Sequence, residues 1–129
     1  MFILDCTLRD GGYYNSWNFP TDVVNEYLHA MASAEVDIVE LGLRSLNNAG
    51  FKGAAAFTTD EYLSTLAIPQ SLKVAVMVNA SELIQASSIE EALASLFPTS
   101  SDNSRVDVVR IACHVHEFEK ALPASTWVK

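Results

Sequence analysis

The sequence predicts an α/β protein in which short strands alternate with helices and form a parallel sheet. Half of the 129 residues are hydrophobic and 19% are charged, so the chain can bury a substantial core. Four short apolar runs are separated by segments whose apolar side chains recur at helical spacing. Because these runs are almost continuously apolar, they are typical of parallel strands in a sheet covered by helices.

The first half of the chain contains two strand–helix units. Their expected elements are, in chain order, a strand at 2–7, a polar glycine-rich loop at 8–20, a helix at 20–31, a strand at 36–43, a loop at 44–58 and a short helix at 59–66. Pro20 marks the start of the first helix, and Val24, Leu28 and Met31 recur along it at helical spacing.

The second half repeats the pattern twice. Its expected elements are a strand at 71–78 that ends at Asn79, a helix capped by Ser81 and reaching Leu96, a polar loop at 98–105, a strand at 106–113 and a last helix at 118–127. Cys6 and Cys113 each end an apolar run, and we expect both to be small buried side chains within strands.

Two architectures have this alternation, an open doubly wound sheet and a closed (β/α)8 barrel. Four units in 129 residues amount to about half of the roughly 250 residues of a complete barrel. A half barrel would leave sheet edges and apolar helix faces uncovered, so we also expect a homo-oligomer.

Composition excludes several classes of partner. The formal net charge is -8 and no run of Lys and Arg occurs, which argues against binding to nucleic acid or to a membrane surface. The apolar stretches are shorter than the roughly 20 residues that a membrane helix needs. Two cysteines without a signal peptide favour a cytoplasmic protein.

Polar and ionisable residues gather where the expected strands end, which is where α/β proteins carry their functional sites. The first strand is followed by Arg9, Asp10, Gly11 and Gly12. A carboxylate beside two residues that are free to adopt positive φ can point at a cation, and the neighbouring guanidinium can hold an oxyanion that the cation polarises. The alternative is an ordinary turn with a surface ion pair.

The run Leu4-Asp5-Cys6-Thr7-Leu8-Arg9-Asp10-Gly11-Gly12-Tyr13 resembles the opening of the DRE-TIM metallolyase superfamily, and within it the 4-hydroxy-2-oxovalerate aldolase-like proteins. The strand end Val39-Glu40-Leu41-Gly42-Leu43-Arg44-Ser45 is also similar to that family. The resemblance implies that residues 1–129 form the truncated N-terminal part of a TIM-barrel domain, namely its first four βα units. It covers essentially the whole chain but only the first half of the family's catalytic domain.

The resemblance also implies roles for individual residues. Asp10 would be a ligand of a divalent metal ion, Mn²⁺ or Mg²⁺, and Arg9 would bind the keto or enolate oxygen of the substrate. Glu40 would orient water, metal or substrate, with a purely structural ion pair to Arg44 or Arg9 as the alternative. Arg110 would bind a substrate carboxylate. Further substrate-binding candidates at these strand exits are Gly11, Tyr13, Arg44, Asn79 and His114.

Two features depart from the family pattern. Tyr13 and Tyr14 stand where aldolases of this kind have a histidine base, so a different substrate or proton route is expected. The family's remaining metal ligands are a His-x-His pair about a hundred residues further along than His114-Val115-His116. We therefore expect His114 to line the substrate pocket, with His116 in solvent at a helix start.

Together these features predict a metal-dependent aldolase or carbon–carbon lyase that acts on a small 2-keto acid through an enolate. The isolated chain would lack two metal ligands and is expected to be inactive. One rival is a non-catalytic parallel α/β domain that binds a small anion or a protein partner. An open-sheet nucleotide-binding enzyme is a second rival, but no glycine-rich phosphate loop follows any strand.

Overall fold

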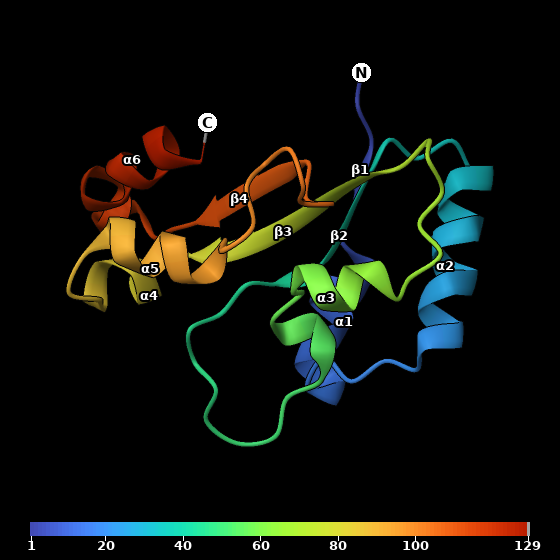
Figure 1. Ribbon diagram of the computed structural model, residues 1–129, viewed down its shortest axis with the longest axis horizontal. Coiled ribbons are helices and arrows are strands. Elements are labelled where there is room, and N and C mark those ends of the chain that lie inside the picture. Colours follow the sequence, from blue (N-terminus) through green and yellow to red (C-terminus); the bar gives the residue numbers. More distant parts are fainter. Residues whose placement is uncertain (129) are drawn as a thin grey trace.

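The computed structural model describes residues 1–128 (Figure 1). Its strands are β1 (Leu4–Asp5), β2 (Ile38–Leu43), β3 (Lys73–Asn79) and β4 (Val108–Ala112). Its helices are α1 (Thr7–Asn15), α2 (Thr21–Ser33), α3 (Asp60–Ser64), α4 (Ala80–Gln85), α5 (Ile89–Leu96) and α6 (Phe118–Trp127), with short 3-10 turns η1 (Ala54–Ala56) and η2 (Val115–Glu117).

The four strands form one parallel sheet in the order β1-β2-β3-β4, which confirms the predicted α/β class. A doubly wound sheet would reverse its strand order at a switch point. The sequential order found here is that of consecutive βα units in a barrel, so the chain has the architecture of the first part of a TIM barrel.

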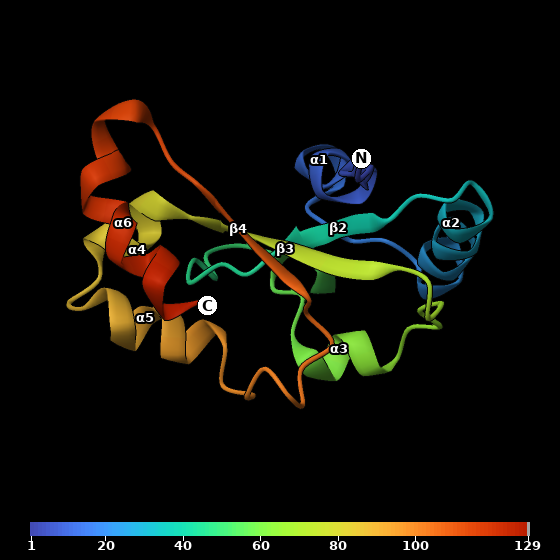
Figure 2. The same cartoon turned by 90° about the horizontal axis from the view of Figure 1, so that it is seen from above.

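The hydrophobic core lies between one face of the sheet and the helices. Figure 2 shows α3 and α5 on this face and α1 on the opposite face. Val24 and Leu28 from α2 pack with Val39 and Leu41 from β2, and all four are at most 1% exposed. A second cluster, built from β3, α4, α5 and α6, continues the core toward the C-terminus.

Two helix predictions were wrong. The segment after β1, expected to be a loop, forms α1. The helix expected from Ser81 to Leu96 is divided into α4 and α5, and Ser81 lies inside α4 instead of capping it. The side chain of Ser88 accepts a hydrogen bond from the backbone N–H of Glu91, so this serine caps a new helix where the first one ends.

Cysteine burial was also predicted wrongly. Cys6 is only partly buried and precedes α1, and Cys113 lies beyond the end of β4 and is exposed. Within the part of the chain that the structure describes, no helix is long and apolar enough to cross a membrane.

Candidate functional site

A buried carboxylate, Glu40 of β2, joins two arginines that are distant in sequence. Arg9 Nε donates to Glu40 Oε1 over 2.7 Å. Arg110 Nε and Nη2 donate to Glu40 Oε2 and Oε1, each over 2.6 Å, so this second contact is bidentate. Arg9 comes from α1 and Arg110 from β4, and the cluster of Arg9, Glu40 and Arg110 therefore ties three elements together.

The register of the sheet explains why these groups meet. Glu40 is paired with Ala75, and Met77 of the same strand is paired with Arg110. Paired residues of parallel strands project to the same face, and so do residues two apart on one strand. Glu40 and Arg110 therefore share the face opposite the main helical core, which is the face that α1 covers (Figure 2).

The environment of Glu40 keeps it ionised. Burial alone would raise the pKa of this carboxyl, but hydrogen bonds and charge from Arg110 and Arg9 outweigh burial and hold the pKa below its usual range. The thiol of Cys6 lies beside the same groups, and burial together with the negative charge of Glu40 raises its pKa. At neutral pH the cluster thus contains one carboxylate, two guanidinium groups and an uncharged thiol.

Both arginines keep hydrogen-bonding capacity. Arg110 Nη1 has no acceptor among residues 1–128, and the further partner of Arg9, beyond Glu40 and Asp10, is the thiol of Cys6, a weak acceptor. The Arg110 side chain is 39% exposed and that of Arg9 is 14% exposed, whereas Glu40 is fully buried. The cluster can therefore offer N–H donors to an anion from solvent without giving up its internal ion pairs.

The helix α1 gives the Arg9-Asp10-Gly11-Gly12 segment a conformation that we did not predict. The positive φ angles occur just after the helix, at Ser16 and Trp17, and both glycines are helical. Gly12 is required for a different reason, because a Cβ atom there would lie 2.0 Å from the Trp17 ring. That ring also donates from Nε1 to the carbonyl of Arg9 over 3.1 Å, which fixes the turn of helix carrying the arginine.

Asp10, the predicted metal ligand, forms an ion pair with Arg9, and its side chain is 63% exposed. Among the described residues no group of three His, Cys, Asp or Glu side chains is placed to hold a metal ion. Glu40 is not free to act as a metal ligand, since both of its carboxylate oxygens accept hydrogen bonds from arginine. Residues 1–128 by themselves therefore do not fit a complete divalent-metal site.

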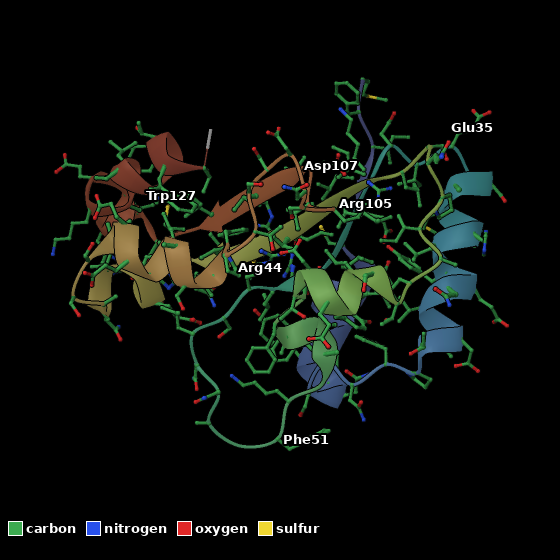
Figure 3. The ribbon with its side chains drawn as sticks, in the orientation of Figure 1. Glu35, Arg44, Phe51, Arg105, Asp107 and Trp127 are labelled. Carbon is green, nitrogen blue, oxygen red and sulfur yellow. The ribbon has the colours of Figure 1, made fainter. Side chains whose placement is uncertain are left out.

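Arg44 was predicted to bind substrate, but the structure places it away from the cluster. Its guanidinium donates to the carbonyls of Thr58 and Leu96 and forms a 3.0 Å ion pair with Asp60. It also lies over the Phe97 ring at 4.6 Å. Figure 3 places Arg44 between α3 and α5, and its side chain is 2% exposed.

A strand irregularity explains the position of Arg44. Strict alternation would put residues 40, 42 and 44 on one face. The pairing with β3 shifts between Glu40 and Gly42, so the side chains that follow exchange faces. Gly42 then faces η1, where a Cβ atom would lie 1.9 Å from the Ala55 carbonyl oxygen, so only glycine fits.

A second polar group, which the sequence analysis missed, lies at the ends of β2 and β3. Glu82 of α4 accepts hydrogen bonds from Ser45 Oγ at 3.0 Å, from the Leu46 backbone N–H at 2.7 Å and from Asn79 Nδ2 at 3.2 Å. Asn79 was a predicted substrate-binding residue, and the structure places it in this group. The sequence signal for this group was weak. Glu82 lies three residues after Asn79, but acidic residues are also common in the first turn of any helix.

Of the remaining candidates, Tyr13 and His114 are exposed and Gly11 is partly buried. Tyr13 stacks edge-on against Trp17 on α1, and Gly11 has free space around it apart from Phe19. His114 follows β4, and its ring is parallel to that of His116 at 5.5 Å. His116 lies in η2, close to the predicted helix start, and His114 has no hydrogen bond to the arginine–glutamate cluster.

The chain is similar to one solved structure over nearly its whole length. That structure is described as the N-terminal domain of a putative aldolase from Bacteroides vulgatus, with 31% sequence identity and a TM-score of 0.86. No protein-family model matches the chain, and no curated protein is significantly similar to it. The match covers 99% of this chain, so it includes the arginine–glutamate cluster. It covers 40% of the other chain, so this chain spans less than half of that protein's length.

Proposed function

We propose that this chain is the N-terminal part of an aldolase, a carbon–carbon lyase, and that its arginine–glutamate cluster binds a small 2-keto acid. The observation that carries the proposal is the pair of arginines held by buried Glu40, with the Arg110 side chain 39% exposed on the same face of the sheet. The 31% identity to a domain described as part of an aldolase supports the reaction class.

In this proposal the two arginines bind different oxygens of the substrate. Arg110 is the more exposed, and its free Nη1 can donate to a substrate carboxylate. Arg9 lies at the start of α1 and can donate to the neighbouring keto oxygen, where negative charge develops as an enolate forms. Glu40 acts through both arginines as a positioning residue, because its oxygens are already occupied.

A test of this proposal is hydrogen exchange of the pyruvate methyl group in D₂O, followed by proton NMR. Enolate formation replaces methyl protons with deuterium and needs no second substrate. We expect exchange in the longer protein that contains this chain, and at least about a hundredfold slower exchange after Arg9→Lys, the usual loss when one oxyanion donor is removed. Exchange unaffected by Arg9→Lys would contradict the role of Arg9.

The metal dependence belongs to the same proposal. A divalent ion would supply an electrophile for the keto oxygen, and Asp10 is the ligand that the family resemblance implies. We expect the isolated chain to bind Mn²⁺ weakly in a calorimetric titration and to lose that binding in Asp10→Ala. Glu26→Ala, which removes another exposed carboxylate from α2, is the matched control and should leave binding unchanged. Equal binding by the Asp10→Ala variant would exclude Asp10 as a ligand.

A non-catalytic anion-binding domain remains the second candidate. It is favoured because the described residues form no complete metal site. The two functions differ in one result. An anion-binding domain would bind pyruvate without promoting exchange of its methyl protons, even within the longer protein and with Mn²⁺ present.

A further inference from the structure

The guanidinium of Arg9 already has three partners within the chain. Its Nε donates to Glu40 over 2.7 Å, its Nη1 forms an ion pair with Asp10, and the thiol of Cys6 is the third partner. Arg110, in contrast, has no acceptor for Nη1 among residues 1–128. The two arginines of the cluster therefore differ in whether a ligand must displace an ion pair to reach them.

The three partners of Arg9 differ in how easily they can be replaced. Glu40 is fully buried and also holds Arg110. Cys6 is partly buried, at the junction of β1 and α1. Asp10 lies largely in water, with its side chain 63% exposed. Because exposed ion pairs contribute little to stability, Asp10 is the partner that a ligand can replace most readily.

The helix does not force Arg9 and Asp10 together. Side chains at neighbouring positions of an α-helix do not face each other, so the contact depends on the length of the arginine side chain. Asp10 can therefore turn into water while the backbone of α1 stays as it is. The Nη1 group that it releases lies on the solvent side of the arginine, where a ligand arrives.

We propose that the Asp10 carboxylate competes with the substrate for Arg9, and that a 2-keto acid binds by displacing Asp10 with its keto oxygen. This role of Asp10 rests on the proposed function, which assigns the keto oxygen to Arg9. The substrate carboxylate meets no such competitor, because Arg110 offers it Nη1. The ion pair is thus an autoinhibitory contact that affects one of the two oxygen sites.

Two simpler roles of Asp10 make different predictions. An acid in the first turn of a helix stabilises the helix through its dipole, and that role has no effect on the affinity for a ligand. A carboxylate near the site also repels every anion, and that role affects all ligands of equal charge alike. Competition for Arg9 affects a ligand with a keto oxygen more than a ligand without one.

The test compares pyruvate with acetate, which have the same charge but differ in the keto oxygen. Both are titrated into the longer protein that contains this chain, with metal ions removed by EDTA, and binding is followed by NMR chemical shifts. The uncharged amide in Asp10→Asn is a weaker acceptor for a guanidinium. We expect this variant to raise the ratio of the acetate Kd to the pyruvate Kd about two- to fivefold, as loss of an exposed ion pair allows.

The matched control is Asp22→Asn. Asp22 lies in the first turn of α2 as Asp10 lies in that of α1, and both are exposed. The control removes the same charge and should leave the ratio unchanged. Asp10→Ala, which leaves no acceptor, should raise the ratio at least as far as Asp10→Asn. Unchanged far-UV circular dichroism spectra establish that the variants are folded.

Failure of this role and failure of the proposed function give different results. If the wild type binds pyruvate and the ratio is the same in Asp10→Asn, Asp10 does not compete, and the proposed function stands without it. An equal gain for pyruvate and acetate, or an equal rise in Asp22→Asn, overturns the competition in the same way. If neither the wild type nor Asp10→Asn binds pyruvate, both the 2-keto acid assignment and the competition are wrong.

Discussion

The arginine–glutamate cluster is built around Glu40 of β2, and the Arg44 network around the residue that directly follows β2, four positions along the chain, yet the two differ in one respect. The Arg44 guanidinium has acceptors in two carbonyls and Asp60, and an aromatic ring packs against it. Arg9 and Arg110 share a single buried carboxylate, and Arg110 Nη1 has no acceptor among residues 1–128. The first arrangement stabilises the fold, and the second leaves donors for a ligand.

The difference follows from which face of the sheet each residue occupies. Arg44 lies on the helical face between α3 and α5 (Figure 3). There Thr58 and Leu96 supply carbonyl acceptors, Asp60 of α3 supplies a carboxylate, and the side chain is only 2% exposed. Glu40 lies on the opposite face, where α1 supplies one arginine and β4 the other.

The largest effect on stability is expected for Arg44→Met. The substitution keeps most of the side-chain volume but leaves Asp60 and the carbonyls of Thr58 and Leu96 without their donor. Breaking a buried ion pair in this way costs about 3 to 5 kcal/mol. Urea unfolding followed by circular dichroism measures the loss, and a change below about 1 kcal/mol would contradict a structural role.

A smaller loss is expected for Glu40→Gln. The amide keeps the shape of the side chain but removes the charge that neutralises Arg9 and Arg110. A hydrogen bond to a charged group contributes about 1.5 to 3 kcal/mol, and both arginines can still turn toward solvent. The free energy of unfolding should therefore fall by about 2 to 3 kcal/mol. An unchanged value would mean that Glu40 does not hold the arginines.

The stability difference between the wild type and Glu40→Gln should depend on pH. The pKa of Glu40 is lowered in the folded state, so its contribution is complete above the unfolded value near 4.5 and is lost as pH falls through the folded value. Asp60, next to Arg44, also has a lowered pKa, but both proteins share it. Urea unfolding between pH 7 and pH 3 should show the difference shrinking toward acid. A constant difference would contradict the pairing.

The smallest effect is expected for Arg105→Lys. Arg105 pairs with Asp107 at 3.4 Å, and both side chains are more than a third exposed. Exposed pairs of this kind contribute about 0 to 1 kcal/mol, so urea unfolding should give almost the wild-type value. A larger loss would mean that this exposed ion pair also stabilises the fold, so that burial alone would not explain why Arg44 matters more than Arg105.

The sequence predicted the parallel sheet because the inner strands are continuously apolar and the helices have apolar faces at regular spacing. It placed Arg9, Glu40 and Arg110 in one site, and the structure brings them together. It could not predict the face of Arg44, because the irregularity between Glu40 and Gly42 arises from packing of η1 against β2. Helix α1 was missed since two glycines read as loop, although contact with Trp17 requires one of them.

The most direct test of the account is a pyruvate titration of the wild type, Arg110→Lys and Arg105→Lys, followed by NMR chemical shifts. Lysine keeps the ion pair with Glu40 but loses the planar fork that also reaches a ligand. The account predicts that Arg110→Lys weakens pyruvate binding by about tenfold or more while Arg105→Lys leaves it unchanged. Equal affinity of all three proteins would show that pyruvate does not bind at the cluster of Arg9, Glu40 and Arg110.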